Sequence, residues 1–265
     1  GMPRWLRVSW LLLLSIGTVA AIVGSVLALP LERVRPERVA DNVSRFASRF
    51  IPESWDAVLA LPWAHLSQAL IETVQMAIVG TTLGILLSLP LAILASRRTA
   101  PGWLRVPMRL GLNLWRTVPS ILWALLMVAV LPLGSIAGVA ALAAYSMGYL
   151  TKFFYEALED ADAKPAEAVR RLGASRFQAF WHATLPAARP ALLGSCFFVF
   201  EYNIRAASIL GIVGAGGIGQ DLKYYIDWRL FPEAGAGLLL LAMVVIALDA
   251  VSQAWRRHLA ARRGS

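Results

Sequence analysis

Ten residues in the last quarter of the chain, GIVGAGGIGQ at 211–220, match a pattern that can bind a dinucleotide. Gly214, Gly216 and Gly219 follow the spacing G-x-G-x-x-G, in which glycines let the backbone approach a pyrophosphate at the start of a helix. That chemistry requires a buried strand before the glycines and a helix after them. The elements around this segment therefore decide what the motif means.

A second group of residues places polar and charged side chains inside long apolar runs. Arg116, Glu201, Asn203 and Arg205 lie in such runs, where ionisable groups are costly and are candidates for function. Glu201 and Arg205 are four residues apart, so on a helix they share a face and can pair. A guanidinium can also attract an oxyanion, because its planar fork matches the anion's oxygens. The sequence leaves both roles open.

The composition indicates an integral membrane protein. Hydrophobic residues make up 58% of the 265 positions and charged residues 15%, against roughly 45–50% and about 25% in soluble domains. The net charge of +9 would suit nucleic acid on a polar fold with a basic patch, but these arginines lie between apolar runs, so no nucleic-acid partner is expected. The single cysteine, Cys196, excludes an intrachain disulfide, and the three scattered histidines predict no metal site.

Six apolar runs predict transmembrane helices, since a helix needs about 20 residues to cross the hydrocarbon core. They cover residues 8–29, 69–95, 110–131, 134–155, 187–212 and 235–251. The first run ends in Leu-Pro-Leu-Glu-Arg rather than in a small-residue cleavage site, which favours an uncleaved anchor over a signal peptide. The expected fold is an all-α membrane protein with six transmembrane helices.

The distribution of positive charge predicts the orientation. Most lysines and arginines fall in the connections that are cytoplasmic if the N-terminus is inside, so both termini are expected in the cytoplasm. In the first outer connection, Val39, Val43, Phe46 and Phe50 recur at helical spacing, which predicts an amphipathic extracytoplasmic helix. The chain then divides into a first helix with this segment (1–65), a core of five transmembrane helices (66–255) and a basic cytoplasmic tail (256–265).

This arrangement argues against a dinucleotide site. Residues 211–220 follow a predicted transmembrane helix rather than a strand, and they lie on the outer side, away from cytoplasmic nucleotides. Gly214, Gly216, Gly217 and Gly219 instead permit a tight turn and close approach of helices. A membrane oxidoreductase that uses the motif is a distant alternative.

The inner loop between the fourth and fifth predicted spans, residues 160–186, carries the most informative spacing. Its stretch 164–186 is KPAEAVRRLGASRFQAFWHATLP. Pro165 suits the first turn of a helix, Glu167 complements the N-terminal dipole, and Gly173 can end the helix. A short amphipathic helix is expected, with Arg170 and Arg171 available to solvent or to a partner.

This loop resembles the hallmark of permease subunits of ATP-binding-cassette (ABC) importers, E-A-A, three residues, G, nine residues, I-x-L-P. Here Glu167-Ala168-Val169 is followed at the same spacing by Gly173 and by Ala183-Thr184-Leu185-Pro186. Val169 and Ala183 depart from the pattern but stay small or apolar. Two further segments, LWRTVPSILWALL (114–126) and FEYNIRAASILGIVGAGGIG (200–219), are similar to phosphonate-type permeases. The resemblance covers roughly residues 66–253.

The resemblance implies a type I importer permease fold and a homodimer in the bacterial inner (plasma) membrane. It also implies an ATPase dimer at the cytoplasmic face and a solute-binding protein outside. ATP and Mg²⁺ would be bound by the ATPase, so neither a cofactor nor an enzymatic activity is expected on this chain. The residues expected to couple to the ATPase are Glu167, Ala168, Arg170, Arg171, Gly173, Leu185 and Pro186.

The resemblance further implies transport of phosphonate or related phosphorus oxyanions. Arg116, Glu201, Asn203 and Arg205 are then candidates for the translocation path. Gly214, Gly216, Gly217 and Gly219 are candidates for the extracytoplasmic gate. A permease for another solute, such as methionine, phosphite or hypophosphite, is the alternative, because selectivity in such importers usually resides in the solute-binding protein.

Overall fold

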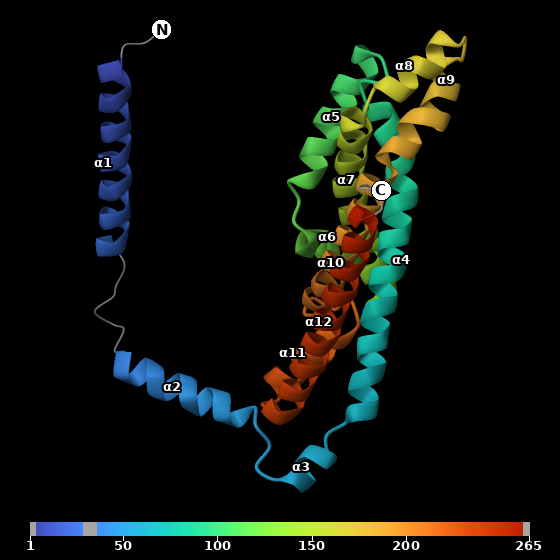
Figure 1. Cartoon of the computed structure of the whole chain (residues 1–265). Coiled ribbons are helices and arrows are strands. Elements are labelled where there is room, and N and C mark those ends of the chain that lie inside the picture. The colour runs from blue at the N-terminus through green and yellow to red at the C-terminus, as the bar shows by residue number, and fades with distance from the viewer. Residues whose placement is uncertain (1–3, 29–35, 262–265) are drawn as a thin grey trace. The chain divides into compact units, whose positions relative to one another are not determined.

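A computed structural model describes residues 4–28 and 36–261, and within these ranges it contains helices and no strand (Figure 1). The all-α prediction is confirmed for this part of the chain. Residues 1–49 and 50–265 form two compact units. Leu29 of the first predicted span, Arg33 and Arg35 of the outer connection, and the last four residues of the basic tail lie outside the described residues.

The N-terminal unit contains α1 (Arg4–Ala28) and α2 (Pro36–Arg49). α1 coincides with the first predicted span, although its apolar part with described side chains, Leu13–Ala28, is shorter than a full span. α2 is the amphipathic helix expected in the first outer connection. Three residues of its predicted apolar stripe, Val39, Val43 and Phe46, lie within the helix. The fourth, Phe50, directly follows it.

The C-terminal unit is a bundle of long helices joined by shorter ones (Figure 1). Their bounds are α3 Trp55–Leu59, α4 Trp63–Ala95, α5 Gly102–Arg116, α6 Ser120–Val130, α7 Ser135–Asp160, α8 Lys164–Arg171, α9 Arg176–Ala179, α10 Leu185–Gly211, α11 Ile218–Asp227 and α12 Phe231–Ala261. A π-helical turn, Phe180–Thr184, joins α9 to α10, so the fifth predicted span is the end of a helix that begins at Arg176. The apolar pattern does not predict α11, because that helix carries polar residues on much of its surface.

Three helical stretches among the described residues are long and apolar enough to cross a membrane: Trp63–Ala95, Arg176–Gly211 and Phe231–Ala254. The bent pair α5 and α6 makes a fourth if it counts as one span. α7, predicted as a span over 134–155, is not among them, because its glycines, tyrosines and Lys152 lower its hydropathy. The complete set of six spans therefore stays a prediction.

The third predicted span, residues 110–131, is wrong as a single helix. α5 ends at Arg116, α6 begins at Ser120, and the two helices are bent by 86°. Pro119 caps α6 in an extended conformation (φ −61°, ψ 154°). Proline lacks the amide donor and disfavours helix at the preceding residue, so the helix breaks completely here. The break places Arg116 at a helix end instead of within a continuous helix.

α7 is the central helix of this unit and packs against α4, α6 and α10. Its approach to α4 depends on small residues. A β-carbon at Gly80 would lie 2.6 Å from the Cβ of Leu142, and one at Gly84 would lie 2.5 Å from the Cβ of Ser146. Both distances are too short for a side chain, so the glycines allow the two backbones to come close. Because other helices surround α7, it can carry polar residues that lipid would not tolerate.

Candidate functional site

α8 carries the first half of the loop motif. Glu167 lies in its first turn, and Arg170 and Arg171 lie in its last turn, where carboxylate and guanidinium complement the helix dipole. No residue of α8 is buried, Ala168 included. Gly173 ends the segment with φ +93°, a left-handed conformation that favours glycine. The predicted helix is present, and its charged side chains are open to solvent or to a partner.

Leu185 and Pro186, the other half of the motif, begin α10 instead of ending a loop. Both are partly buried. Pro186 stands in the first turn of α10, directly after the π-helical turn. The segment 160–186, which was predicted as a loop, is therefore largely helical, and it continues directly into α10.

A buried carboxylate that the sequence analysis does not single out fixes the α4–α5 turn to the end of α7. Glu159 has a side chain that is 5% exposed. It accepts hydrogen bonds from the backbone N–H of Arg97 at 2.6 Å, from Arg97 Nε at 2.9 Å, and from Arg109. Arg98 donates to the carbonyl oxygens of Glu159, at 2.7 Å, and of Ala161. Arginines that served only to predict orientation thus have a structural role.

Glu201 and Arg205 form the ion pair that their spacing allows. Arg205 donates to Glu201 Oε1 at 2.8 Å within α10. The side chain of Glu201 is 12% exposed and that of Arg205 is 50% exposed. The carboxylate therefore lies against the bundle, and the guanidinium extends to the surface of the single chain.

Arg116 occupies the last turn of α5, next to the break before α6. Its guanidinium donates to Asn113 Oδ1 at 2.8 Å and lies 5.8 Å from the centre of the Tyr149 ring. Its Nε is buried and has no hydrogen-bond partner within the described residues. A cation with an unused donor at a helix break is able to bind an anion.

Asn203 lies inside the bundle instead of on its surface. It is 0% exposed, and its Nδ2 donates to Thr81 Oγ1 of α4 at 2.8 Å and to Ser146 Oγ of α7 at 2.7 Å. One amide thus joins three helices, α4, α7 and α10. In the single chain it does not reach solvent.

A row of aromatic rings on α7 and α10 was missed by the sequence analysis. The Tyr145 ring stacks on Tyr202 with centroids 5.0 Å apart and contacts Tyr149 at 4.6 Å. The row continues from Tyr149 to Phe153 at 6.5 Å and on to Phe198 at 6.0 Å. Tyrosines four residues apart in an apolar run were the available signal, because i, i+4 residues share a helix face. The row connects the Arg116 guanidinium with α10.

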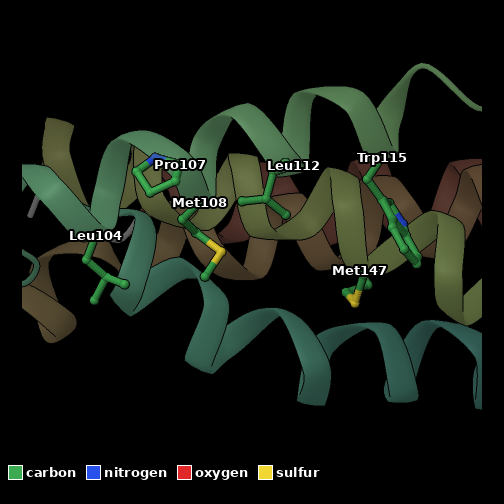
Figure 2. Close-up of a pocket in the computed structure, with 7 residues that line it drawn as sticks. Leu104, Pro107, Met108, Leu112, Trp115 and Met147 are labelled. Atoms are coloured by element: carbon green, nitrogen blue, oxygen red, sulfur yellow. The ribbon is translucent and has the colours of Figure 1, made fainter.

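The apolar groove in Figure 2 has different chemistry. It has a volume of about 400 Å³ and lies between α5, which supplies Leu112 and Trp115, and Met147 of α7. Its other lining side chains are Leu104, Pro107 and Met108 (Figure 2). The lining carries no charged side chain, so this groove suits an acyl chain or an apolar side chain and not an oxyanion.

The glycine-rich segment forms a non-helical turn over residues 212–217. Gly214, Gly216 and Gly217 have positive φ values of 90°, 83° and 70°. Gly219 lies in the first turn of α11 instead. The turn expected over residues 211–219 is confirmed for residues 212–217. It is wrong for Gly211, which ends α10, and for Ile218 and Gly219, which begin α11.

The glycine turn is fixed to two other elements. The backbone N–H of Ile218 donates to Thr73 Oγ1 of α4 at 2.8 Å, in a buried contact. The N–H of Gly134, before α7, donates to the carbonyl oxygen of Gly214 at 2.9 Å. A segment that the sequence defines only by its glycines is therefore part of the packed structure.

A polar pocket of about 250 Å³ lies beside this turn, between α4 and α11. His65 Nε2 is 3.2 Å from Asp221 Oδ2, and Glu72 also lines the pocket. Nearby, burial and then the carboxylates of Asp221 and Glu233 raise the pKa of Tyr225, so this phenol stays neutral at neutral pH. Within residues 4–28 and 36–261 no group of three or more His, Cys, Asp or Glu is placed to hold a metal ion.

Comparison with protein families gives one match that covers most of the chain. Residues 84–265 match the family described as binding-protein-dependent transport system inner membrane component. The matched region includes the loop motif on α8, the Glu201–Arg205 pair and the glycine turn.

Two curated relatives are similar over most of the chain. The phosphate-import permease protein PhnE of Mycolicibacterium smegmatis is 38% identical over 242 residues, which cover 89% of this chain and 44% of that protein. The phosphite transport system permease protein PtxC of Stutzerimonas stutzeri is 39% identical over 190 residues, which cover 71% and 69% of the two chains. The chain thus spans less than half the length of the mycobacterial relative.

Two solved structures share the fold. A chain of the MetNI methionine ABC transporter in an inward-facing conformation gives a TM-score of 0.65 at 22% identity, over 73% of this chain and 95% of that chain. A chain of an amino acid ABC transporter gives a TM-score of 0.63 at 18% identity, over 73% and 93%. At these identities the likeness concerns the fold alone.

Proposed function

Because the chain belongs to the family of binding-protein-dependent transport system inner membrane components, we propose that it is the permease subunit of an ABC importer for phosphonate or a related phosphorus oxyanion. The family resemblance drawn from the α8 loop is confirmed by this match. The observation that carries the substrate class is the 38–39% identity to relatives named for phosphate and phosphite.

The proposed membrane arrangement has six spans with both termini in the cytoplasm. α1, α7 and the bent α5–α6 pair then complete the set of six, of which length and hydropathy alone give three or four. The arginine-rich α4–α5 turn and α8 lie on the same side, which the positive-inside rule assigns to the cytoplasm. In this arrangement α2 is extracytoplasmic, and the residues from 256 onward form a cytoplasmic tail.

For the translocation path we assign the first role to Arg116. Its buried Nε lacks a partner among the described residues, and the tyrosine row lies next to it, so it offers both charge and hydrogen-bond donors to an oxyanion. Arg205 is half-exposed and is the second candidate, although its bond to Glu201 also supports a structural role. Asn203, buried between three helices, serves the path by fixing their positions.

For coupling we propose that α8 docks on an ATPase dimer that binds ATP and Mg²⁺. The motif residues Glu167, Ala168, Arg170, Arg171 and Gly173 form an exposed helix and its end. From Arg176 the chain is helical to Gly211, so a displacement of α8 can be transmitted along α10 towards the glycine turn. Leu185 and Pro186 lie at the start of that helix.

At the outer side we propose that Gly214, Gly216, Gly217 and Gly219 contribute to the gate beneath a solute-binding protein. A second copy of this chain would complete the pore as a homodimer. The bonds from the turn to Thr73 and Gly134 support a gate that moves together with α4 and the start of α7.

Reconstituted transport tests this proposal. Proteoliposomes that contain the chain, its ATPase and its solute-binding protein should accumulate phosphonate in an ATP-dependent manner. Arg116→Ala should reduce uptake with complex yield unchanged, whereas Arg189→Ala, an exposed arginine on α10, should transport normally. Uptake of phosphite or hypophosphite would show which phosphorus oxyanion of the proposed class is the substrate. Uptake of methionine with no uptake of any phosphorus oxyanion would refute the substrate proposal.

A further inference from the structure

A basic pocket lies between α8, α9 and the turn that joins α4 to α5. Its volume is about 360 Å³, within the roughly 300–1,000 Å³ typical of small-ligand sites. Arg97 and Arg98 line it from the α4–α5 turn, Arg170 from α8 and Arg176 from α9. Glu167 is the single carboxylate among the described residues that line it, so positive charge predominates.

The four guanidinium groups differ in the ion pairs and hydrogen bonds that they already make. Arg97 pairs with the buried carboxylate of Glu159, and Arg98 donates only to the main-chain carbonyls of Glu159 and Ala161, which carry no net charge. Arg170 and Arg176 are exposed, and in the described part of the chain the structure records neither an ion pair nor a hydrogen bond for their guanidinium groups. Of the four guanidinium groups, only that of Arg97 thus has a carboxylate partner among the described residues.

Like charges that converge on one cavity repel, and an anion between them relieves the repulsion. Guanidinium groups match the oxygens of a phosphate group better than an ammonium does, because the planar fork donates two parallel hydrogen bonds. We propose that this pocket binds a phosphate-class oxyanion, either free in solution or as the headgroup of an anionic lipid. Arg170 and Arg176 are its principal ligands, and Arg98 adds charge from the opposite side.

A bound oxyanion connects segments that lie far apart in the sequence. It joins α8 and α9 to the α4–α5 turn, which Glu159 in turn fixes to α7. Occupancy therefore restrains α8 and lowers amide hydrogen exchange in residues 161–179. The inference rests on the lining of the pocket and not on the substrate proposed above, so either can fail without the other.

Titration of the full-length chain in neutral maltoside detergent tests the site with inorganic phosphate. Ionic strength is held constant with chloride, so that screening alone produces no signal. Calorimetry should show saturable binding that Arg176→Gln weakens roughly tenfold, the loss expected for one charge-assisted contact. Arg170→Gln, on the other helix, should weaken it to a similar extent. Arg189→Gln, which removes an exposed arginine of α10 outside the lining, should bind as the unmodified chain does.

A second arm distinguishes the two sources of the oxyanion. Mixed micelles that contain phosphatidylglycerol are compared with micelles that contain phosphatidylcholine, for the unmodified chain and for Arg176→Gln. If inorganic phosphate binds and Arg176→Gln weakens this binding, the site takes a free anion. If phosphatidylglycerol binds but inorganic phosphate does not, and Arg176→Gln weakens the lipid binding, the site takes a headgroup. Absence of saturable binding by both probes, or an equal loss in Arg189→Gln, overturns the proposal. Equal melting temperatures of the variants show that each is folded.

Discussion

Arg205 and Glu201 lie one turn apart on α10 and form an ion pair, with 2.8 Å between the guanidinium and the carboxylate. Because Glu201 is 12% exposed, Arg205→Ala takes the ion-pair partner from a largely buried carboxylate, which is more harmful than loss of the whole pair. We expect a lower yield of folded complex and a lower melting temperature, and recovery of both in the double variant with Glu201→Gln. If Arg205→Ala instead assembles normally but loses uptake, Arg205 acts on the moving anion.

Asn203 provides a second test at the level of a single side chain. Asn203→Ala removes two hydrogen bonds and leaves the hydroxyls of Thr81 and Ser146 without their donor inside the bundle. We expect a loss of roughly 1–3 kcal/mol in the free energy of unfolding, measured by thermal or denaturant unfolding in detergent. Thr82→Ala is the matched control, since this exposed hydroxyl donates to Ile78 of its own helix, α4, and the unfolding of this variant should be almost unchanged.

At the scale of elements, the glycine turn is more constrained than a flexible gate requires. Gly217 has φ +70°, and a β-carbon there would lie 2.5 Å from Thr73 Oγ1, the group that accepts the N–H of Ile218. Gly217→Ala should therefore destabilise the folded chain by about 1–3 kcal/mol, whereas a pure gating role would leave stability unchanged.

The control for this substitution is Gly194→Ala in α10. Apart from its chain neighbours and the backbone of its own helix, no described atom lies within 4 Å of the position of a β-carbon at Gly194, and alanine favours helix over glycine by roughly 1 kcal/mol. Its melting temperature should be equal or higher. If Gly194→Ala lowers the melting temperature as much as Gly217→Ala does, the turn is no more sensitive to alanine than the helix is, and the prediction for Gly217 is wrong.

α8 is the other element whose role can be tested. Glu167→Lys adds positive charge to a helix end that already faces several arginines, and it opposes the helix dipole at the first turn. We expect weaker association with the ATPase and lower uptake, measured by co-purification and transport. Glu53→Lys makes the same charge change at an exposed position far from α8 in the sequence, and it should leave both unchanged. Normal association of Glu167→Lys would refute the coupling assignment.

At the scale of the whole molecule, the orientation can be tested by thiol labelling. The single cysteine allows a cysteine-free background, Cys196→Ala. In this background Leu172→Cys, at a side chain that is 88% exposed, should react with a membrane-impermeant maleimide only after the cells are permeabilised. Glu53→Cys should react in intact cells. The opposite pattern would invert the proposed topology.

The sequence by itself determined the class of the protein and its family. Apolar content, the six long runs and the loop spacing from Glu167 to Pro186 are local properties, and each can be recognised without knowledge of neighbouring helices. The match over residues 84–265 confirms the family, and the described residues, which form helices and no strand, confirm the all-α class. Gly214, Gly216 and Gly217 indicated a turn, because glycine frees the backbone where it stands.

Only the tertiary structure decided which helix faces meet. The bond of Arg97 with Glu159 spans 62 positions, that of Asn203 with Thr81 spans 122, and that of Ile218 with Thr73 spans 145. In a soluble helix the apolar stripe marks the packed face, but α4 and α10 are apolar on nearly all sides because lipid and protein interior are both apolar. Hydrophobic periodicity therefore carries no information about their partners. Small residues and a few buried polar groups set the contacts, and their pairing becomes visible only when the helices are packed together.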